Sequence, residues 1–265
     1  MDIAVITIGI DPTIELGPIT LAWHGIGIAA GIAVGAVFAR RYASERDLDR
    51  EALLSAVIVI ALAGIVGARL FFLLENDPGA LLRPADWFGT NGFAFYGGMI
   101  FGTAAAALFL WRTRLGLRYL DAIAAGFPIG MAVGRVGDVI NGEHYGPPSD
   151  LPWAVRNTHP DADVPSTAMA YHSGGLYEVV LALVMFAVIW PLRHRFQKQL
   201  TLLWTVVGAY GLGRFVMFFY RADSEDAALG LNGAQWTSVA LVGIAAVGIA
   251  WAKLRKRGSS ASDRP

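Results

Sequence analysis

The sequence predicts an all-α membrane protein of seven transmembrane helices, with the N-terminus outside the cell and the C-terminus in the cytoplasm. Of its residues 55% are hydrophobic and only 16% are charged, whereas a soluble domain carries roughly a quarter charged residues. Apolar runs of about 20 residues, the length that crosses the hydrocarbon core, recur along the chain. Lys and Arg gather in every second connection between these runs, as the positive-inside rule describes.

The predicted spans form a single integral membrane domain over residues 1–265. They lie near residues 18–39, 53–74, 93–111, 120–141, 174–191, 200–220 and 233–252. The fourth span is the least regular, because Asp121, Arg135 and Asp138 interrupt it. The N-terminal stretch lacks a basic region and meets Asp11 early, so we expect the first span to insert and stay rather than to be cleaved as a signal peptide.

The distribution of positive charge predicts the orientation. The connections after the first, third, fifth and seventh spans hold 15 of the 21 Lys and Arg residues, which assigns them to the cytoplasm. The two long connections, residues 75–92 and 142–173, then lie outside. Both are rich in Pro, Gly, Asp and Trp, so we expect a small extracytoplasmic loop region with some structure of its own.

Composition also excludes several classes of function. The net charge is zero, so the balance of charges implies no nucleic-acid partner. The chain has no cysteine, which excludes disulfides and thiolate chemistry by its own side chains. His144, His159 and His172 do not have the spacing of metal ligands, so we expect no zinc site, no other metal and no cofactor.

Five polar residues are predicted to lie at one depth in the outer third of the bilayer. Arg69, Arg135 and Arg214 lie 14–16 residues along outward-running spans, or about 21–24 Å from the inner face of a core roughly 30 Å thick. His24 and Tyr96 lie about 5–10 Å below the outer surface on inward-running spans. Intramembrane arginine is costly, and its planar fork matches phosphate oxygens, so this layer predicts a site for a lipid phosphate. The alternative is that each arginine only extends its guanidinium group to the membrane–water interface and has no other role.

The end of the fourth span carries the most specific motif. Residues 134–146 read Gly-Arg-Val-Gly-Asp-Val-Ile-Asn-Gly-Glu-His-Tyr-Gly. This resembles the signature of bacterial prolipoprotein diacylglyceryl transferases, Gly-Arg-x-Gly-Asn-Phe-x-Asn-x-Glu-x-x-Gly. Further short segments are similar to family segments in the same order: Trp23–Gly25, Gly67–Arg69, Tyr96–Gly98, Leu151–Val155, Leu176–Glu178, Arg214–Phe215, Arg221 and Gln235.

The resemblance implies a reaction and its partners. The family moves the diacylglyceryl group of phosphatidylglycerol, a membrane lipid, onto the lipobox cysteine thiol of a preprolipoprotein, and glycerol-1-phosphate leaves. The reaction takes place at the outer face of the bacterial cytoplasmic (inner) membrane, where the protein is a multi-pass membrane protein. By the same resemblance, substrate-binding residues would be Arg69, Arg135, Asp138, Asn141, Glu143 and Gly146.

The chemistry makes two demands on the site. Charge that gathers on the departing phosphate needs fixed donors, for which Arg135 and Arg214 are the candidates, with Arg69 as a weaker one. The substrate thiol, with a pKa of about 8.5, must lose its proton near the moment of attack. Asn141 and Glu143 either bond lipid glycerol hydroxyls or stabilise the turn toward Gly146, and both readings stay open.

The chain departs from the family pattern in the identity of the base. The family's His is Tyr96 here, while the Tyr that is usual in the first span is His24. We therefore expect His24 to act as the base or to assist it, and Tyr96 to donate a hydrogen bond, since an imidazole accepts a proton near neutral pH and a phenol does not. The alternative is that both residues only pack and bond.

Further departures concern the partners of the arginines. Asp138 replaces the first Asn of the signature and lies three residues after Arg135, where the two charges would neutralise each other. Phe218 replaces the Glu that usually follows Arg214, so we expect Asp138 to take over as partner of that arginine. Glu178 is a second candidate partner for an arginine. Residues 173–175 read Ser-Gly-Gly where Pro-Ser-Gln is usual, which predicts an altered outer end of the fifth span.

Two other functions compete with the transferase. A catalytically altered, phospholipid-binding relative would keep the arginines and lose the base. A membrane transporter would place polar groups at the bilayer midplane. The inner halves of the spans carry almost no ionisable residue apart from Asp121 near the border, which disfavours transport.

Overall fold

The computed structural model describes residues 4–17, 19–87, 92–222 and 226–254. The long helices of this part are α1 Trp23–Ser44, α2 Arg50–Asn76, α3 Phe95–Thr113, α4 Arg118–Asn141, α5 Gly174–Leu192, α6 Thr201–Met217 and α7 Gly233–Leu254. The 3₁₀ turns are η1 Pro78–Leu82, η2 Pro84–Trp87, η3 Arg193–Arg195 and η4 Phe218–Tyr220. The basic residues that the sequence places after Leu254 lie outside the described residues.

Six helices of the described part are long and apolar enough to cross a membrane. They are α1, α2, α4, α5 with η3, α6 with η4, and α7. The remaining long helix, α3, has 19 residues. The prediction of a helical, multi-pass membrane protein is therefore confirmed at this level.

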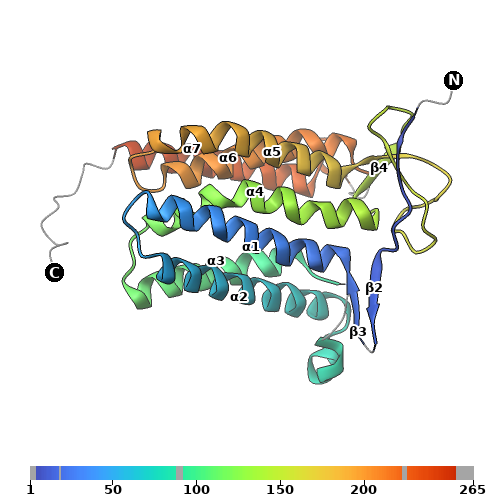
Figure 1. Ribbon diagram of the computed structural model, residues 1–265, viewed down its shortest axis with the longest axis horizontal. Coiled ribbons are helices and arrows are strands. Elements are labelled where there is room, and N and C mark those ends of the chain that lie inside the picture. The colour runs from blue at the N-terminus through green and yellow to red at the C-terminus, as the bar shows by residue number, and fades with distance from the viewer. Residues whose placement is uncertain (1–3, 18, 88–91, 223–225, 255–265) are drawn as a thin grey trace, which may run out of the picture.

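The helices run side by side along the long axis of the molecule (Figure 1). The principal contacts pair α1 with α4, α2 with α3, and α6 with α7, and α5 packs on α4. In Figure 1 the α1–α4 pair lies in the middle, with α2 and α3 on one side of it and α5, α6 and α7 on the other. Residues on α1 and α4 are therefore central to the bundle.

Glycines let α1 and α4 touch backbone to backbone. Gly27, Gly31 and Gly35 on α1 face, in that order, Gly134, Gly130 and Gly126 on α4, and the four-residue spacing keeps each set on one helix face. A Cβ atom on Gly130 would lie only 2.7 Å from the carbonyl oxygen of Gly31. At Gly31, Gly126 and Gly130 no side chain larger than hydrogen fits without moving the helices apart.

The end of the bundle far from the strands holds the apolar core and one buried carboxylate. Tyr42, Leu53, Ala122 and Leu202 belong to this core. Asp121 accepts hydrogen bonds from the backbone N–H groups of Leu200 (2.7 Å) and Leu203 (2.9 Å). The only ionisable residue noted for the inner halves of the spans thus caps the N-terminus of α6, which is a structural task.

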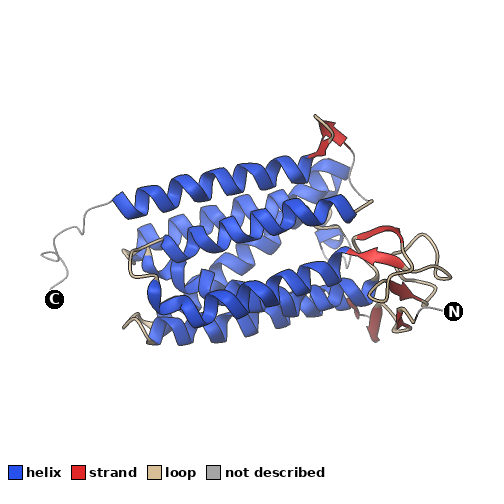
Figure 2. Ribbon diagram, turned by 90° about the horizontal axis from the view of Figure 1, so that it is seen from above, coloured by secondary structure: helices blue, strands red, loops and turns tan. Residues whose placement is uncertain are grey.

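The other end carries short strands (Figure 2). A four-stranded sheet has the order β1–β5–β6–β4, and two hairpins pair β2 with β3 and β7 with β8. The strands are β1 Ile6–Ile8, β2 Thr13–Leu16, β3 Ile19–Ala22, β4 Tyr145–Pro148, β5 Val155–Asn157, β6 Tyr171–Ser173, β7 Asp226–Ala228 and β8 Leu231–Asn232. The expectation that residues 142–173 have structure of their own is confirmed.

The predicted start of the first span was wrong. We expected a span near 18–39, but the helix begins at Trp23, because residues 19–22 form β3 and pair antiparallel with β2. Residues 19–22 are mostly apolar and lead directly into the helix, so the sequence does not mark where the strand ends and the helix begins. The helices nearest the other six predicted spans begin and end within about three residues of the predicted limits.

Candidate functional site

The candidate site lies where the last turns of α4 meet the first turn of α1, at the end of the bundle that carries the strands. Arg135, Asp138 and Asn141 follow one another at three-residue spacing, so they lie on neighbouring faces of α4. His24 is the second residue of α1. Between the two helices stands Gly137, whose Cβ position would lie 2.9 Å from the Cα atom of His24. The same close helix contact thus brings the imidazole to the carboxylate.

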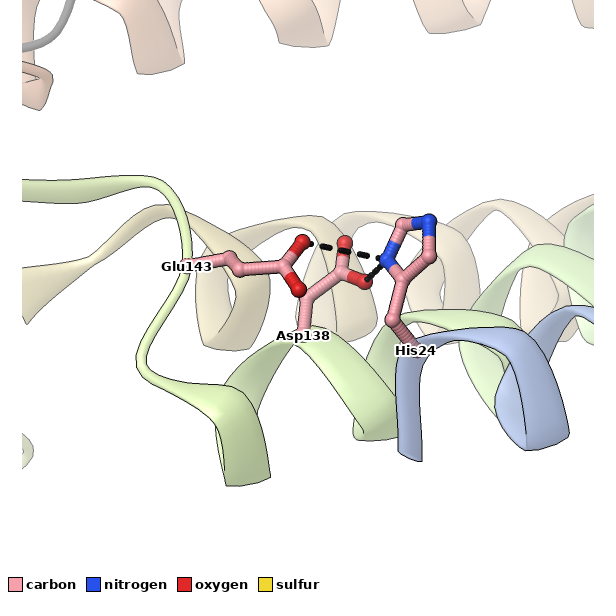
Figure 3. A group of neighbouring side chains, drawn as sticks. All are labelled: His24, Asp138 and Glu143. Carbon is pink, nitrogen blue, oxygen red and sulfur yellow. Dashed lines mark hydrogen bonds and ion pairs between the residues drawn. The ribbon is translucent and has the colours of Figure 1, made fainter. Parts of the chain in front are cut away.

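His24 faces two carboxylates (Figure 3). Its Nδ1 atom lies 2.6 Å from Oδ1 of Asp138 and 3.1 Å from Oε2 of Glu143. The Asp138 side chain is 1% exposed, while the His24 side chain is 26% exposed. In Figure 3 the second ring nitrogen, Nε2, points away from both carboxylates. One nitrogen is therefore held by carboxylates, while the other is turned away from them.

Arg135 lies between two buried carboxylates. It forms ion pairs with Asp138 on its own helix and with Glu178 on α5. Glu178 is 1% exposed, and its Oε1 atom lies 3.3 Å from Nη1 of Arg214 on α6. The same Nη1 donates to the hydroxyl oxygen of Tyr210 at 2.7 Å. A single carboxylate thus joins guanidinium groups from α4 and α6.

This arrangement corrects one expectation and confirms another. We expected Asp138 to replace the missing Glu as partner of Arg214, but Glu178 holds Arg214, because Asp138 is turned toward His24 and Arg135. The candidate role of Glu178 as a partner for an arginine is confirmed. Phe218, which stands in place of that Glu, lies under the Arg214 guanidinium with 4.8 Å to the ring centroid.

Arg69 serves another part of the structure. Its Nη2 atom donates to the carbonyl oxygen of Asp86 at 2.6 Å, and its Nη1 atom to that of Gly92 at 2.8 Å. It also lies over the rings of Phe72 and Phe93. These contacts tie α2 to the connection that leads to α3. The structure thus brings Arg135 and Arg214 together through Glu178, and a phosphate contact by Arg69 stays a prediction.

Three further predicted residues have clear surroundings. Nδ2 of Asn141 donates to Oε1 of Glu143 at 2.9 Å, so the amide helps to orient that carboxylate. The hydroxyl oxygen of Tyr96 lies 3.3 Å from Oγ1 of Thr237 on α7. A Cβ on Gly146 would collide with the backbone carbonyl of Tyr220. Gly146 therefore allows β4 to pack closely on the segment that contains Tyr220, and Gly142, with φ of 82°, forms the turn after α4.

The cluster of His24, Asp138 and Glu143 could also hold a metal ion. Their ligand atoms lie within 4.8 Å of one another. However, the Arg135 guanidinium already neutralises Asp138, and a cation would face it at short range. The donor set fits a charge-paired polar network better than a metal centre, and we assign no metal to it.

Sequence reasoning missed Tyr210 and His144. Tyr210 lies one helical turn before Arg214, and that spacing could have pointed to it. His144 follows Glu143 directly, and its Nε2 atom lies 3.7 Å from Oδ2 of Asp138. Its contact with Asp138 depends on the backbone turn after α4, which the sequence alone does not specify.

Comparison with known proteins gives one consistent result. A family model described as prolipoprotein diacylglyceryl transferase matches residues 12–251. A phosphatidylglycerol–prolipoprotein diacylglyceryl transferase of Thermosynechococcus vestitus is 35% identical over 222 residues, 80% of this chain and 81% of the relative. One of the same name from Rhizobium meliloti is 33% identical, with 96% of this chain and 94% of the relative covered. Another from Synechococcus elongatus is 30% identical, with 95% and 90% covered.

Proposed function

Because this chain belongs to the prolipoprotein diacylglyceryl transferase family, we propose that it transfers the diacylglyceryl group of phosphatidylglycerol to the lipobox cysteine of a preprolipoprotein. Glycerol-1-phosphate is the leaving group. The observation that carries the proposal is the linkage of two guanidinium groups, Arg135 and Arg214, through the buried carboxylate of Glu178. Fixed donors from two helices suit a lipid phosphodiester whose charge grows as the ester bond breaks.

Each part of the site has a task in this reaction. The thiolate sulfur attacks the glyceryl carbon that bears the phosphate ester, the C–S bond forms, and the C–O bond breaks with its electrons going to the phosphate. Arg135 and Arg214 meet that charge. Asp138 accepts from Nδ1 of His24, with Glu143 3.1 Å from the same nitrogen, which leaves Nε2 to take the thiol proton. The proton then passes to the leaving phosphate or to water.

The proposal includes the position of the protein in the cell. Seven helices cross the cytoplasmic membrane, the strand-bearing end faces outward, and the chain forms one integral membrane domain. The excess of Lys and Arg in the connections at the opposite end of the bundle supports this orientation. Lipobox-containing preprolipoproteins would meet the site from the outer leaflet.

The proposal is tested with purified protein in vesicles and a lipobox peptide. The phosphatidylglycerol carries its label in the diacylglyceryl unit, which is the part that reaches the peptide. Wild-type protein should yield a thioether-linked diacylglyceryl peptide, and a peptide with Ser in place of the lipobox Cys should yield none. Arg135→Ala should lower the rate at least about 100-fold, since it removes a donor to the departing phosphate. Arg112→Ala is the matched control and should leave the rate unchanged, because Arg112 is in the last turn of α3, at the end of the bundle away from the site.

One observation favours a second candidate, the catalytically altered relative that binds phospholipid without transferring it. Arg135 is already paired with Asp138 and Glu178, and these carboxylates compete with a lipid phosphate for its donors. Saturable binding of phosphatidylglycerol by wild-type protein with no thioether product would support this candidate and overturn the transferase.

A further inference from the structure

His144 holds an unusual backbone conformation beside the candidate site. Its φ is 62°, in the left-handed region, where a residue other than glycine is uncommon. Its carbonyl oxygen accepts from the N–H of Gly174 at 2.9 Å, which ties the turn after α4 to the start of α5. Glycine, asparagine and histidine are the residues that this backbone region accepts most readily, so the contacts of the imidazole indicate why histidine stands here.

The contact of the His144 ring with Arg221 indicates where the ring carries its proton. Nη2 of Arg221 lies 2.9 Å from Nδ1 of His144. A guanidinium can only donate, so Nδ1 accepts and the ring carries its proton on Nε2. Nε2 lies 3.7 Å from Oδ2 of Asp138, so the N–H side of the ring faces the buried carboxylate. Arg221 thereby orients a neutral imidazole toward Asp138.

Asp138 is thus approached by basic groups on both of its oxygens. His24 contacts Oδ1, and Arg135 and His144 lie at Oδ2. The family signature has an uncharged Asn at this position, which would need fewer such partners. The carboxylate is 1% exposed and bonds the ring that we propose as the base, so whatever fixes the carboxylate also fixes that ring.

The chain of contacts continues from Arg221 back to the arginine pair. The Arg221 guanidinium lies 4.5 Å from the ring centroid of Phe218, and that of Arg214 lies 4.8 Å from the centroid of the same ring. Arg214 contacts Glu178, and Glu178 contacts Arg135. Together with the Phe218 ring, these groups form a closed ring of contacts, in which His144 links the segment after α6 to Asp138.

We infer that His144 is a positioning residue for the proposed transfer. It holds Asp138, and through Asp138 it holds the His24 ring with Nε2 directed at the substrate thiol. The inference rests on the proposed function for its kinetic consequence. Its structural content, a neutral Nε2–H imidazole aimed at Asp138 and set by Arg221, does not depend on that function.

The kinetic test uses His144→Gly, which removes the imidazole and relieves the left-handed backbone. We expect kcat to fall on the order of tenfold, with KM for phosphatidylglycerol within about twofold, because alignment is lost while the arginines remain. Leu229→Gly is the matched control, since Leu229 also has a positive φ of 54° but is exposed at the turn between β7 and β8. Full activity in His144→Gly, with the control unchanged, would overturn the inference.

A double-mutant cycle tests whether the effect passes through Asp138. Asp138→Asn keeps the shape of the side chain, and Glu143 remains near Nδ1 of His24, so residual activity is expected. In the Asp138→Asn protein, His144→Gly should lower kcat by a clearly smaller factor than it does in the wild-type protein. An equal cost in both backgrounds would show that His144 does not act through Asp138 and would contradict the inference.

Histidine-labelled ¹⁵N spectra of the protein in lipid nanodiscs separate the two proposals. We expect one signal, lost in His144→Gly, from a neutral ring protonated at Nε2, and Arg221→Gln should shift it. A ring protonated at Nδ1 would overturn the assignment of His144 whatever the activity. If wild type forms no thioether while this signal is present, the proposed function fails and the contact with Asp138 stands.

Discussion

At the scale of single residues, the site is organised by carboxylates that are almost completely buried. A buried charge without a partner costs several kcal/mol, and each carboxylate here is paired on more than one side. Glu178 is shared by Arg135 and Arg214, and Asp138 by His24 and Arg135. These acids hold the arginines in position, so we expect them to determine where a lipid phosphate binds in the proposed reaction.

Glu178→Gln should therefore damage both stability and transfer. Breaking a buried ion pair by removing one partner costs about 3–5 kcal/mol, and here two guanidinium groups lose the same partner. We expect a lower unfolding temperature in detergent and a loss of thioether formation of about 100-fold or more.

Glu45→Gln is the control for this change. Glu45 also accepts from an arginine, with Nη2 of Arg193 at 2.8 Å, but this pair lies near the surface at the other end of the bundle. The Arg193 guanidinium lowers the pKa of the Glu45 carboxyl. The pair therefore adds to the free energy of unfolding at a pH above the unfolded-state pKa of Glu45, and this stabilisation is lost as the pH falls through the folded-state pKa. We expect Glu45→Gln to lower the free energy of unfolding by less than about 1 kcal/mol. Equal effects of the two substitutions would contradict the central place of Glu178.

The base assignment leads to a second residue-scale prediction. His24→Ala should reduce kcat by about 100-fold or more, since the imidazole is the proposed proton acceptor. Tyr96→Phe should have a smaller effect, because the hydroxyl of Tyr96 bonds Thr237 and not the carboxylate pair. Thiol transfer followed across pH 5–9 measures both. Undiminished activity of His24→Ala would dismiss His24 as the base.

At the scale of elements, the α1–α4 pair sets the geometry of the site. His24 belongs to one helix and Asp138 to the other, and glycines keep the two backbones in contact along their length. A helix pair packed without side chains has little freedom to adjust its separation. The distance between imidazole and carboxylate therefore depends on residues far along both helices.

Gly31→Ala should test this dependence. The added methyl would collide with the carbonyl oxygen of Gly130, and overpacking of this kind costs about 1–3 kcal/mol. We expect a lower unfolding temperature and reduced transfer, although Gly31 lies two turns from His24. Gly243→Ala on α7 is the control, because a Cβ there meets nothing within 4 Å, and it should be neutral or slightly stabilising. A fully active, fully stable Gly31→Ala protein would contradict this account.

The sequence was informative where the signal is local. Spans of about 20 apolar residues predicted the long helices closely, because membrane insertion imposes that length. The signature at residues 134–146 placed Arg135, Asp138, Asn141 and Glu143 together, since they are near in sequence. The strands were not predicted, because segments of two to four residues are defined by pairing with distant partners. The bridge from Glu178 to two arginines is likewise a contact between three helices, which no local pattern specifies.

At the scale of the whole molecule, the two ends of the bundle differ in character. Short strands and the candidate site occupy one end, and the apolar core and the Asp121 cap occupy the other. Basic residues are concentrated in the connections at the core end, among them Arg112, Arg114 and Arg118. This asymmetry predicts the orientation in the membrane.

Single cysteines can test the orientation directly, because the chain has none of its own. Asp150→Cys, between β4 and β5, should react in intact cells with a membrane-impermeant maleimide. Gly116→Cys, between α3 and α4, should react only after the membrane is opened. The fold should tolerate this substitution, because a Cβ at Gly116 meets nothing within 4 Å. The opposite labelling pattern would place the site on the cytoplasmic side and contradict the proposed encounter with preprolipoproteins.

The glycine seam between α1 and α4 has a consequence for how a lipid and a peptide reach the site. A change in bilayer thickness, or a substrate that wedges between helices, must be accommodated at some helix boundary. The glycines of the α1–α4 seam have no side chains that can rotate to absorb such a displacement, so we expect these two helices to move as one rigid body. We expect the α2–α3 and α6–α7 pairs to shift around them, so that the imidazole keeps its distance from the carboxylate while substrates enter and products leave.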